Sequence, residues 1–328
     1  MIETPITRRR ALSILAAGSA IALGRSRRTP GDRVEWRGTA LGADARIVML
    51  DAHRPSAQET IGDCLAEIER LERSFSLYRS DTELTLLNRA GFLRHPSLDL
   101  RRLLQICKTV NLQSNGLFDP TVQPVWRFYA QWYAGRSERE PPPDRALAPL
   151  LSRIGIEHVD ASADAIVLSG SAQITLNGIA QGYITDRVAE LLRARGWCNV
   201  LIDLGEVRAL DGRPDGSPFT VLVRDTGQIL PLANTAVATS SAATLVFSTA
   251  RGLAHILHPR SGVTPAHWSS VTVQHPSATI ADALSTALFL ADEDELAQIV
   301  RRFPGTAVWA TRKDGFTRRF GGGPTLSS

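Results

Sequence analysis

The sequence predicts an α+β fold. The chain has 328 residues, of which 43% are apolar and 21% are charged, as in a globular protein. Apolar residues recur at helical spacing in some segments, and other segments are short runs rich in β-branched residues. The segments follow the order helix, helix, strand, helix, strands, helix, strand. That order lacks the regular alternation of strand and helix found in a doubly wound parallel sheet.

The N-terminus has the pattern of an export signal. Three arginines at residues 8–10 precede a short apolar run at residues 11–23. The run is shorter than the ~20 residues that a membrane-spanning helix needs, and the paired arginines predict twin-arginine export to the periplasm. We expect residues 1–24 to be a cleaved signal peptide, after which no stable membrane insertion remains. An uncleaved anchor is the alternative.

Charge and cysteine content argue against a nucleic-acid-binding protein and against a protein built on a disulfide framework. Residues 1–24 contain three arginines and one glutamate, so cleavage lowers the formal net charge from +4 to +2. So small a charge does not indicate a nucleic-acid partner. Cys64, Cys107 and Cys198 are odd in number, and the first two lie among periodic apolar residues. Free buried thiols are therefore expected rather than a disulfide framework.

Helix-end signals and apolar spacing place three helices. The first is capped by Ser56 and continues to Phe75, the second spans about residues 100–112, and the third spans about residues 185–195 and ends at Gly196. Short β-rich runs predict strands at residues 45–50, 165–170, 200–205, 219–225, 253–258, 269–275 and 305–312. Three prolines at residues 141–143 mark a surface loop inside one compact unit.

Two glycines and an alanine stand where an apolar run meets the third helix, in the stretch ITLNGIAQGYITD. Glycine allows close backbone approach, and the N–H groups at a helix start form a cradle for phosphate. The spacing of Gly178 and Gly182 matches neither the Gly-x-Gly-x-x-Gly motif of dinucleotide-binding proteins nor the P-loop pattern, however. A tight strand-to-helix turn is the alternative interpretation.

A second candidate is the apolar segment ATIADALSTALFLA, in which Asp282 and Thr286 are four residues apart and share one helix face. A carboxylate buried there needs a partner, and carboxylate with hydroxyl oxygen is a donor set suited to Mg²⁺. The alternative is that Asp282 interacts with the helix dipole while Thr286 only packs.

Two further stretches contain candidate ligand-binding residues. Asp119 precedes Pro120, which keeps it out of helical geometry, and an aromatic cluster follows that suits a core or a ring-stacking surface. In HILHPRSGVTP, a turn presents Arg260, which could clamp a phosphate. A zinc site of His255, His258, His267 and His275 has no supporting spacing. Neither serine-hydrolase nor zinc-protease motifs occur.

These stretches in this order resemble the ApbE family, the FAD:protein FMN transferases. The resemblance covers about residues 36–312 and rests on SLYRSDTELTLLN, GLFDPTVQP, LNGIAQGY, DLGEVRA, ATSSAA, HILHPRSGVTP and ADALST. It implies a T-fold-like α+β architecture with mixed antiparallel sheets and packed helices, over residues 33–320. It also implies FAD as substrate, Mg²⁺ as cofactor, and transfer of FMN to a serine or threonine of an acceptor flavoprotein with release of AMP.

Carried over to this sequence, the resemblance assigns a role to each candidate residue. It implies that Asp282, Thr286 and the backbone carbonyl of Ala180 bind the metal. It implies that Asp282, Arg260 and His255 take part in catalysis. The residues implied around FAD are Tyr78, Asp119, Thr121, Gln181, His255, Arg260 and Gly262.

The sequence departs from the family pattern in three stretches. Gln181 stands where the family has lysine, in a stretch that also loses an acid, and DLGEVRA is one glycine short. The turn HILHPRSGVTP has His258 where the family has aspartate and Ser261 where it has threonine. Similar departures are typical of the NosX-type branch, which implies a membrane-bound acceptor resembling NosR and a link to nitrous-oxide reduction. The lost lysine keeps two alternatives open. One is an FAD pyrophosphatase that releases FMN and AMP, and the other is a flavin-binding maturation factor without turnover.

Overall fold

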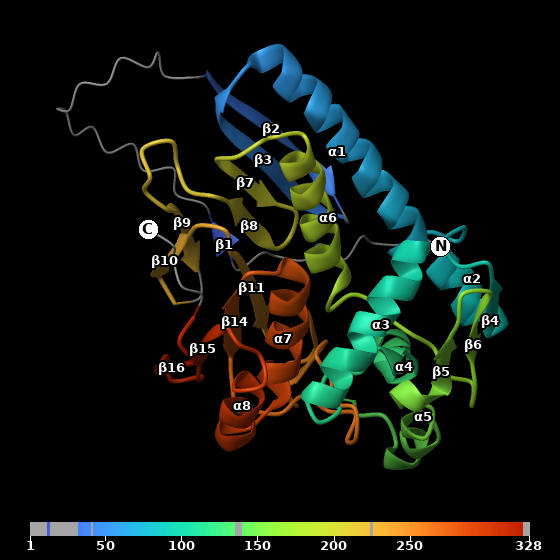
Figure 1. The fold of residues 1–328 in the computed structure, drawn as a ribbon. Coiled ribbons are helices and arrows are strands. Elements are labelled where there is room, and N and C mark those ends of the chain that lie inside the picture. The colour runs from blue at the N-terminus through green and yellow to red at the C-terminus, as the bar shows by residue number, and fades with distance from the viewer. Residues whose placement is uncertain (1–11, 14–31, 41, 135–139, 224–225, 324–328) are drawn as a thin grey trace.

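An eight-stranded antiparallel sheet forms the centre of the fold (Figure 1). Its order is β16 (Thr317–Phe320), β15 (Ala307–Thr311), β14 (Ser270–His275), β11 (Ala236–Ser241), β8 (Val207–Leu210), β7 (Val200–Asp203), β3 (Ala43–Ala52) and β2 (Asp32–Ala40). The structure is a computed structural model and describes residues 12–13, 32–40, 42–134, 140–223 and 226–323. The predicted signal peptide, residues 1–24, lies outside the described residues except for residues 12–13.

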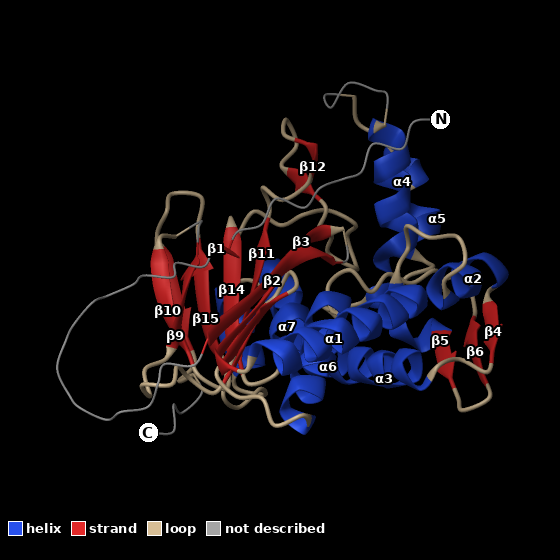
Figure 2. Ribbon diagram, turned by 90° about the horizontal axis from the view of Figure 1, so that it is seen from above, coloured by secondary structure: helices blue, strands red, loops and turns tan. Residues whose placement is uncertain are grey.

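Long helices cover one face of this sheet, as Figure 2 shows. They are α1 (Arg54–Phe75), α6 (Ala180–Ala194) and α7 (Ala278–Leu290), and α3 (Leu98–Gln113) packs against α1 and α7. A small sheet of β1 (Leu12–Ser13), β9 (Phe219–Val223) and β10 (Gln228–Leu232) lies beside the large one. Phe219 and Val221 of β9 pack with Leu201 and Val207 on the face away from the helices. Because both faces are covered, every residue of β7 is buried.

The remaining elements lie at the periphery of this core. They are α2 (Glu83–Ala90), α4 (Gln123–Tyr133), α5 (Ala148–Leu151), α8 (Glu293–Val300), the sheet β4 (Phe92–Arg94), β6 (Ala165–Leu168) and β5 (Val159–Ala161), the hairpin β12 (Val246–Ser248) and β13 (Leu253–Ala254), and the 3-10 turns η1 (Pro120–Val122), η2 (Asp144–Ala146) and η3 (Ile156–His158). Within the described ranges, no helix is both long enough and apolar enough to cross a bilayer.

The predicted α+β class is confirmed, and all strand pairs of the large sheet are antiparallel. Two helix starts are corrected. The first helix begins at Arg54, with His53 as its N-cap and proline in its first turn, so Ser56 lies inside it. The third begins at Ala180 rather than near Thr185, so it includes Gly182. The run at 253–258 is a strand only at Leu253–Ala254.

All three cysteines are free thiols, as the sequence predicted. Cys64 and Cys107 are buried in the main core, and Cys198 is exposed. Burial raises the pKa of both buried thiols, which keeps them protonated and unreactive at neutral pH.

Candidate functional site

The start of α6 lies directly against α7 because two glycines leave room for it. A Cβ added to Gly182 would lie 2.3 Å from the carbonyl oxygen of Ala278 and 2.8 Å from Cβ of Asp282. A Cβ added to Gly178 would lie 2.9 Å from Oγ1 of Thr286. All three distances are shorter than van der Waals contact. The glycine-rich stretch is therefore a close helix-to-helix approach, which explains why it has so little side chain.

Asp282 and Thr286 of α7 face this contact. The Asp282 carboxylate is 4% exposed and accepts a hydrogen bond from the backbone N–H of Gly182 at 3.0 Å. The Thr286 hydroxyl lies 3.4 Å from the Ser240 hydroxyl of β11, which is itself 2.8 Å from the Ser285 hydroxyl. The pair therefore presents a carboxylate and a hydroxyl at the junction of α6, α7 and the central sheet.

The dipole alternative for Asp282 fits the structure poorly. Asp282 is the fifth residue of α7, past the first turn, where the helix dipole acts most strongly. A different carboxylate, that of Asp186, accepts hydrogen bonds from the N–H groups of Ala278 and Thr279 at that terminus. Asp282 instead lines the cavity beside α7.

One cavity brings six of the predicted site residues together: Tyr78, Asp119, Gln181, His255, Asp282 and Thr286. Other residues that line it are Leu117, Phe118, Pro120, Val122, Trp126, Thr175, Asn177, Gly178, Gly205, Glu206, Thr239, Ser240, Ser241, Thr244, Leu245, Ile256, Leu257 and Leu290. Tyr78 is 70% exposed, which places it at the mouth. Thr121, Ala180, Arg260 and Gly262 are not among the lining residues.

Asp119 is held rigidly at one wall of the cavity. It is the N-cap of η1 and accepts hydrogen bonds from the N–H of Thr121 at 2.8 Å and from its hydroxyl at 2.5 Å. The Thr121 hydroxyl in turn accepts the N–H of Gly155. Burial raises the pKa of the Asp119 carboxyl above its usual value. The hydrogen bonds from Thr121 act in the opposite direction but do not outweigh the burial. Thr121 therefore orients Asp119 from behind the cavity wall.

The predicted residues of the HILHPRSGVTP turn separate into two places. His255 lines the cavity, and its Nδ1 lies 3.1 Å from the carbonyl of Leu245, which can only accept a hydrogen bond. The exposed guanidinium of Arg260 points elsewhere and donates to the carbonyl of Asn115 at 2.7 Å, beyond the C-terminal end of α3. Gly262 has a φ of +71° and closes the turn through its N–H bond to the carbonyl of His258.

The four histidines do not form a zinc site. Within the described ranges, no three side chains of His, Cys, Asp or Glu come together as metal ligands. His275 instead accepts the N–H of Ser277 at the start of α7.

Sequence reasoning missed Glu206, and it placed a second lining residue, Trp126, only within an aromatic cluster suited to a core or a ring-stacking surface. Glu206 is a buried carboxylate in the turn between β7 and β8. Its neighbour Gly205 has a φ of +117°, and a Cβ there would lie 2.4 Å from Nε2 of Gln181. Trp126 contacts Phe247 edge-on, with ring centroids 5.6 Å apart. The run DLGEVRA contained the signal for Glu206, because it is one of the motifs of the family resemblance and Glu206 is the charged residue of its turn, between Asp203 and Arg208.

The lining residues give the cavity an acidic character. Asp119, Glu206 and Asp282 contribute carboxylates, and neither lysine nor arginine occurs among the lining residues that the structure describes. A phosphate-containing ligand would therefore need a cation between itself and these groups.

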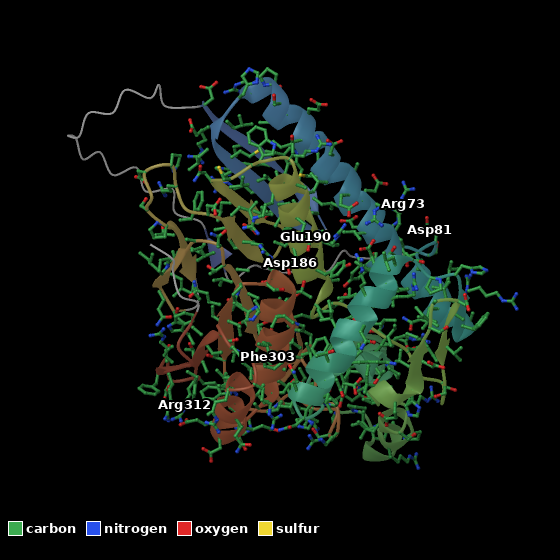
Figure 3. All side chains as sticks on the ribbon, in the orientation of Figure 1. Arg73, Asp81, Asp186, Glu190, Phe303 and Arg312 are labelled. Atoms are coloured by element: carbon green, nitrogen blue, oxygen red, sulfur yellow. The ribbon has the colours of Figure 1, made fainter. Side chains whose placement is uncertain are left out.

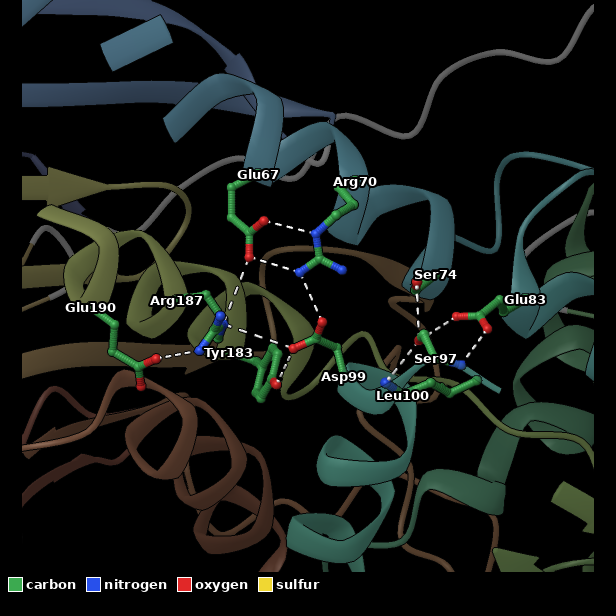
Figure 4. Close-up of polar contacts among 10 residues, drawn as sticks. All are labelled: Glu67, Arg70, Ser74, Glu83, Ser97, Asp99, Leu100, Tyr183, Arg187 and Glu190. Carbon is green, nitrogen blue, oxygen red and sulfur yellow. Dashed lines mark hydrogen bonds and ion pairs between the residues drawn. The ribbon is translucent and has the colours of Figure 1, made fainter. Parts of the chain in front are cut away.

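A polar network holds the other side of α6, and Figure 4 shows it in close-up. The Tyr183 hydroxyl donates to Oδ1 of Asp99 on α3 at 2.7 Å, and Arg70 of α1 donates to Oδ2 at 2.8 Å. Burial acts to raise the pKa of Asp99, but these hydrogen bonds outweigh it and lower the pKa below its usual value. The helix that carries Ala180 and Gln181 is thus fixed on both sides.

The chain is similar to known proteins over most of its length. The FAD:protein FMN transferase of Haemophilus influenzae is 26% identical over 290 residues, or 82% of this chain and 84% of that protein. That of Chlamydia pneumoniae is 27% identical over 250 residues, or 73% and 77%. The apo crystal structure of the flavinyl transferase ApbE of Pseudomonas stutzeri matches with a TM-score of 0.79 at 24% identity, covering 90% of this chain and 97% of that one.

A second solved structure, the ApbE protein of Thermotoga maritima, matches with a TM-score of 0.77 at 25% identity, over 88% of this chain and 97% of that one. The model of the ApbE family matches residues 41–309, which is most of the chain. The resemblance inferred from the seven motifs is therefore confirmed, and this chain belongs to the ApbE family.

Proposed function

We propose that this protein transfers the FMN moiety of FAD, with Mg²⁺, onto a serine or threonine hydroxyl of an acceptor flavoprotein and releases AMP. The names of its relatives in Haemophilus influenzae and Chlamydia pneumoniae support this reaction. The observation that carries the proposal is the Asp282–Thr286 pair, which shares one cavity with Asp119 and His255.

The donor set fits Mg²⁺. The Asp282 carboxylate and the Thr286 hydroxyl are hard oxygen ligands, and Mg²⁺ binds through few protein groups while keeping sites for water and phosphate. The family resemblance adds the carbonyl of Ala180 as a third ligand. The acidic lining favours a cation on electrostatic grounds. When bound, Mg²⁺ neutralises charge on the pyrophosphate and on the leaving phosphate.

The reaction balances without an oxidant or reductant. The acceptor oxygen forms a bond to the phosphorus of the FMN moiety, and the bond from that phosphorus to the bridging oxygen breaks. AMP leaves with the electron pair, and the hydroxyl proton is lost. Within the chain, Asp119 and His255 orient FAD, with Thr121 acting through Asp119. No step is assigned to Arg260, because it donates to a backbone carbonyl outside the cavity.

The test combines purified protein, FAD, Mg²⁺ and an exported acceptor domain, with AMP release and acceptor mass as readouts. We expect the acceptor to gain the mass of FMN, with an equal amount of AMP. Asp282→Ala should lower the rate by about a hundredfold or more, because it removes a metal ligand. Glu190→Gln, an exposed change on α6, is the control and should keep the wild-type rate. Unchanged transfer in Asp282→Ala would refute the metal assignment.

The same assay separates the alternatives. Free FMN with AMP, and no change in acceptor mass, would identify an FAD pyrophosphatase. Bound FAD without any AMP would identify a flavin-binding maturation factor. Gln181 lines the cavity and supplies no charge, so Gln181→Lys should increase transfer if the missing cation limits the rate.

We further propose that residues 1–24 direct twin-arginine export, that residues 33–320 form a periplasmic catalytic domain, and that the acceptor is membrane-bound and NosR-like. The paired arginines support export, and the stretch LNGIAQGY, which departs from the family pattern at Gln181, supports the acceptor. Residues 1–30 fused to a reporter should reach the periplasm, and replacing Arg8 and Arg9 by lysine should stop export. Co-expression with a NosR-like protein should give a covalent flavin on it. Export that does not depend on Arg8 and Arg9 would contradict the assignment of residues 1–24 as a twin-arginine signal.

A further inference from the structure

Helices α6 and α7 run antiparallel and meet at three levels, each one helical turn apart. Gly178 meets Thr286 at the first level, and Gly182 meets Asp282 at the second. At the third level Asp186 meets the N-terminus of α7 (Figure 3). The first two levels face the cavity, and the third lies one turn away from the proposed metal ligand Asp282.

The Asp186 carboxylate connects the two helices at the third level. Its Oδ1 accepts the N–H of Ala278 at 2.8 Å and a hydrogen bond from Arg208 of β8. Its Oδ2 accepts the Ser277 hydroxyl at 2.6 Å and both the N–H and the hydroxyl of Thr279, at 3.0 and 2.7 Å. Asp186 is only 8% exposed. One buried carboxylate therefore joins α6, α7 and the central sheet.

These contacts complete the hydrogen bonding of the first turn of α7. Helices leave their first N–H groups without partners inside the helix. The Asp186 carboxylate accepts the N–H groups of Ala278 and Thr279. The Ser277 hydroxyl accepts the N–H of Ile280, and the His275 ring accepts the N–H of Ser277. The negative charge also opposes the positive end of the helix dipole. The start of α7 is thus attached to α6 rather than only to its own cap.

We propose that Asp186 is a positioning residue that fixes the distance and register of α7 relative to α6, and thereby the place of the Asp282–Thr286 pair. The inference rests on the proposed metal role of that pair. Asp282 follows the attached turn by about one helical turn, so a shift of the N-terminus of α7 moves its carboxylate relative to the N–H of Gly182. Asp186 itself is not among the residues that line the cavity.

The test measures binding of Mn²⁺, used in place of Mg²⁺, by its electron paramagnetic resonance signal in the presence of FAD and without acceptor. Asp186→Asn keeps the side-chain size but turns an amide N–H₂ toward groups that donate hydrogen bonds. If α7 then holds the ligand pair in place about a tenth of the time, Mn²⁺ binds about tenfold more weakly. Thermal unfolding reports whether each variant is folded.

Two further readouts distinguish positioning from general damage. Excess Mn²⁺ should restore the transfer rate of Asp186→Asn, because the ligands are still present, but should not restore that of Asp282→Ala. Glu190→Gln lies on the same helix one turn further on, is exposed, and should bind Mn²⁺ as the wild type does. Should Asp186→Asn not fold, Thr279→Val removes only one of the five donors, and a twofold to threefold weaker Mn²⁺ binding is expected, by roughly 0.5 kcal/mol.

The outcomes separate the two proposals. Weakened Mn²⁺ binding in both Asp282→Ala and Asp186→Asn supports both. Weakened binding in Asp282→Ala but wild-type binding in folded Asp186→Asn overturns the positioning role alone. Wild-type binding in Asp282→Ala overturns the metal site, and the positioning role with it.

Discussion

Replacing Gly182 by alanine tests the close approach of α6 and α7. The new Cβ would lie 2.3 Å from the carbonyl oxygen of Ala278, where about 3.4 Å is needed, so the helices must separate by roughly 1 Å at this level. Overpacking of this kind costs about 1–3 kcal/mol, and the better helix propensity of alanine returns about 0.5–1 kcal/mol. From the middle of both ranges, the free energy of unfolding should therefore fall by about 1 kcal/mol.

Denaturant unfolding measures this change, and Mn²⁺ binding measures its effect on the site. Because Gly182 also donates its N–H to Asp282, separating the helices should weaken Mn²⁺ binding along with stability. Gly62→Ala is the matched control, since Gly62 lies inside α1 and has nothing within 4 Å of an added Cβ. It should gain about 0.5–1 kcal/mol. A Gly182→Ala protein that gains stability as Gly62→Ala does, and binds Mn²⁺ normally, would refute the reasoning.

Three further predictions concern residues around the site. Arg260→Ala should leave the KM for FAD within about twofold of wild type, because the guanidinium lies outside the cavity, and a tenfold rise in steady-state assays would contradict this. Tyr183→Phe removes the buried hydrogen bond to Asp99 and should lower the free energy of unfolding by about 1–2 kcal/mol in urea. Burial lowers the pKa of His275, so the unfolded chain binds its proton first and stability should fall as pH drops below about 6.5. Urea titrations at pH 5.5 and 7.5 should show a smaller fall in His275→Asn.

Local patterns predicted much of the secondary structure but not where α6 begins. The runs near residues 200, 220 and 270 are strands in the structure. The β-branched residues of β7 and β14 lie between two covered faces, whereas β9 buries alternate residues on one face. The glycines before Thr185 appeared to belong to a turn, since glycine is unfavourable inside helices. Packing of Gly182 against α7 outweighs that cost, and the helix extends back to Ala180. Propensity alone cannot reveal a contact with a helix about one hundred residues away.

The same limit applies to the site residues. Asp119, Asp282 and Thr286 were recognisable because each is a polar group in an apolar or proline-restricted setting, and all three line the cavity. Arg260 has the composition of a phosphate clamp, yet its partner is the carbonyl of Asn115, 145 residues away in the sequence. A turn motif specifies how rigidly a side chain is presented but not the direction in which it points.

The acidic lining of the cavity determines which ligands it can bind. A diphosphate brought next to Asp119, Glu206 and Asp282 would meet three carboxylates, with no lysine or arginine in the described lining to offset them. The affinity for FAD should therefore depend strongly on a divalent cation. Accurate placement of the oxygen ligands of that cation should therefore matter for FAD binding as well as for catalysis. The glycine contacts and the Asp186 attachment supply that accuracy, since both set how closely α7 approaches the start of α6.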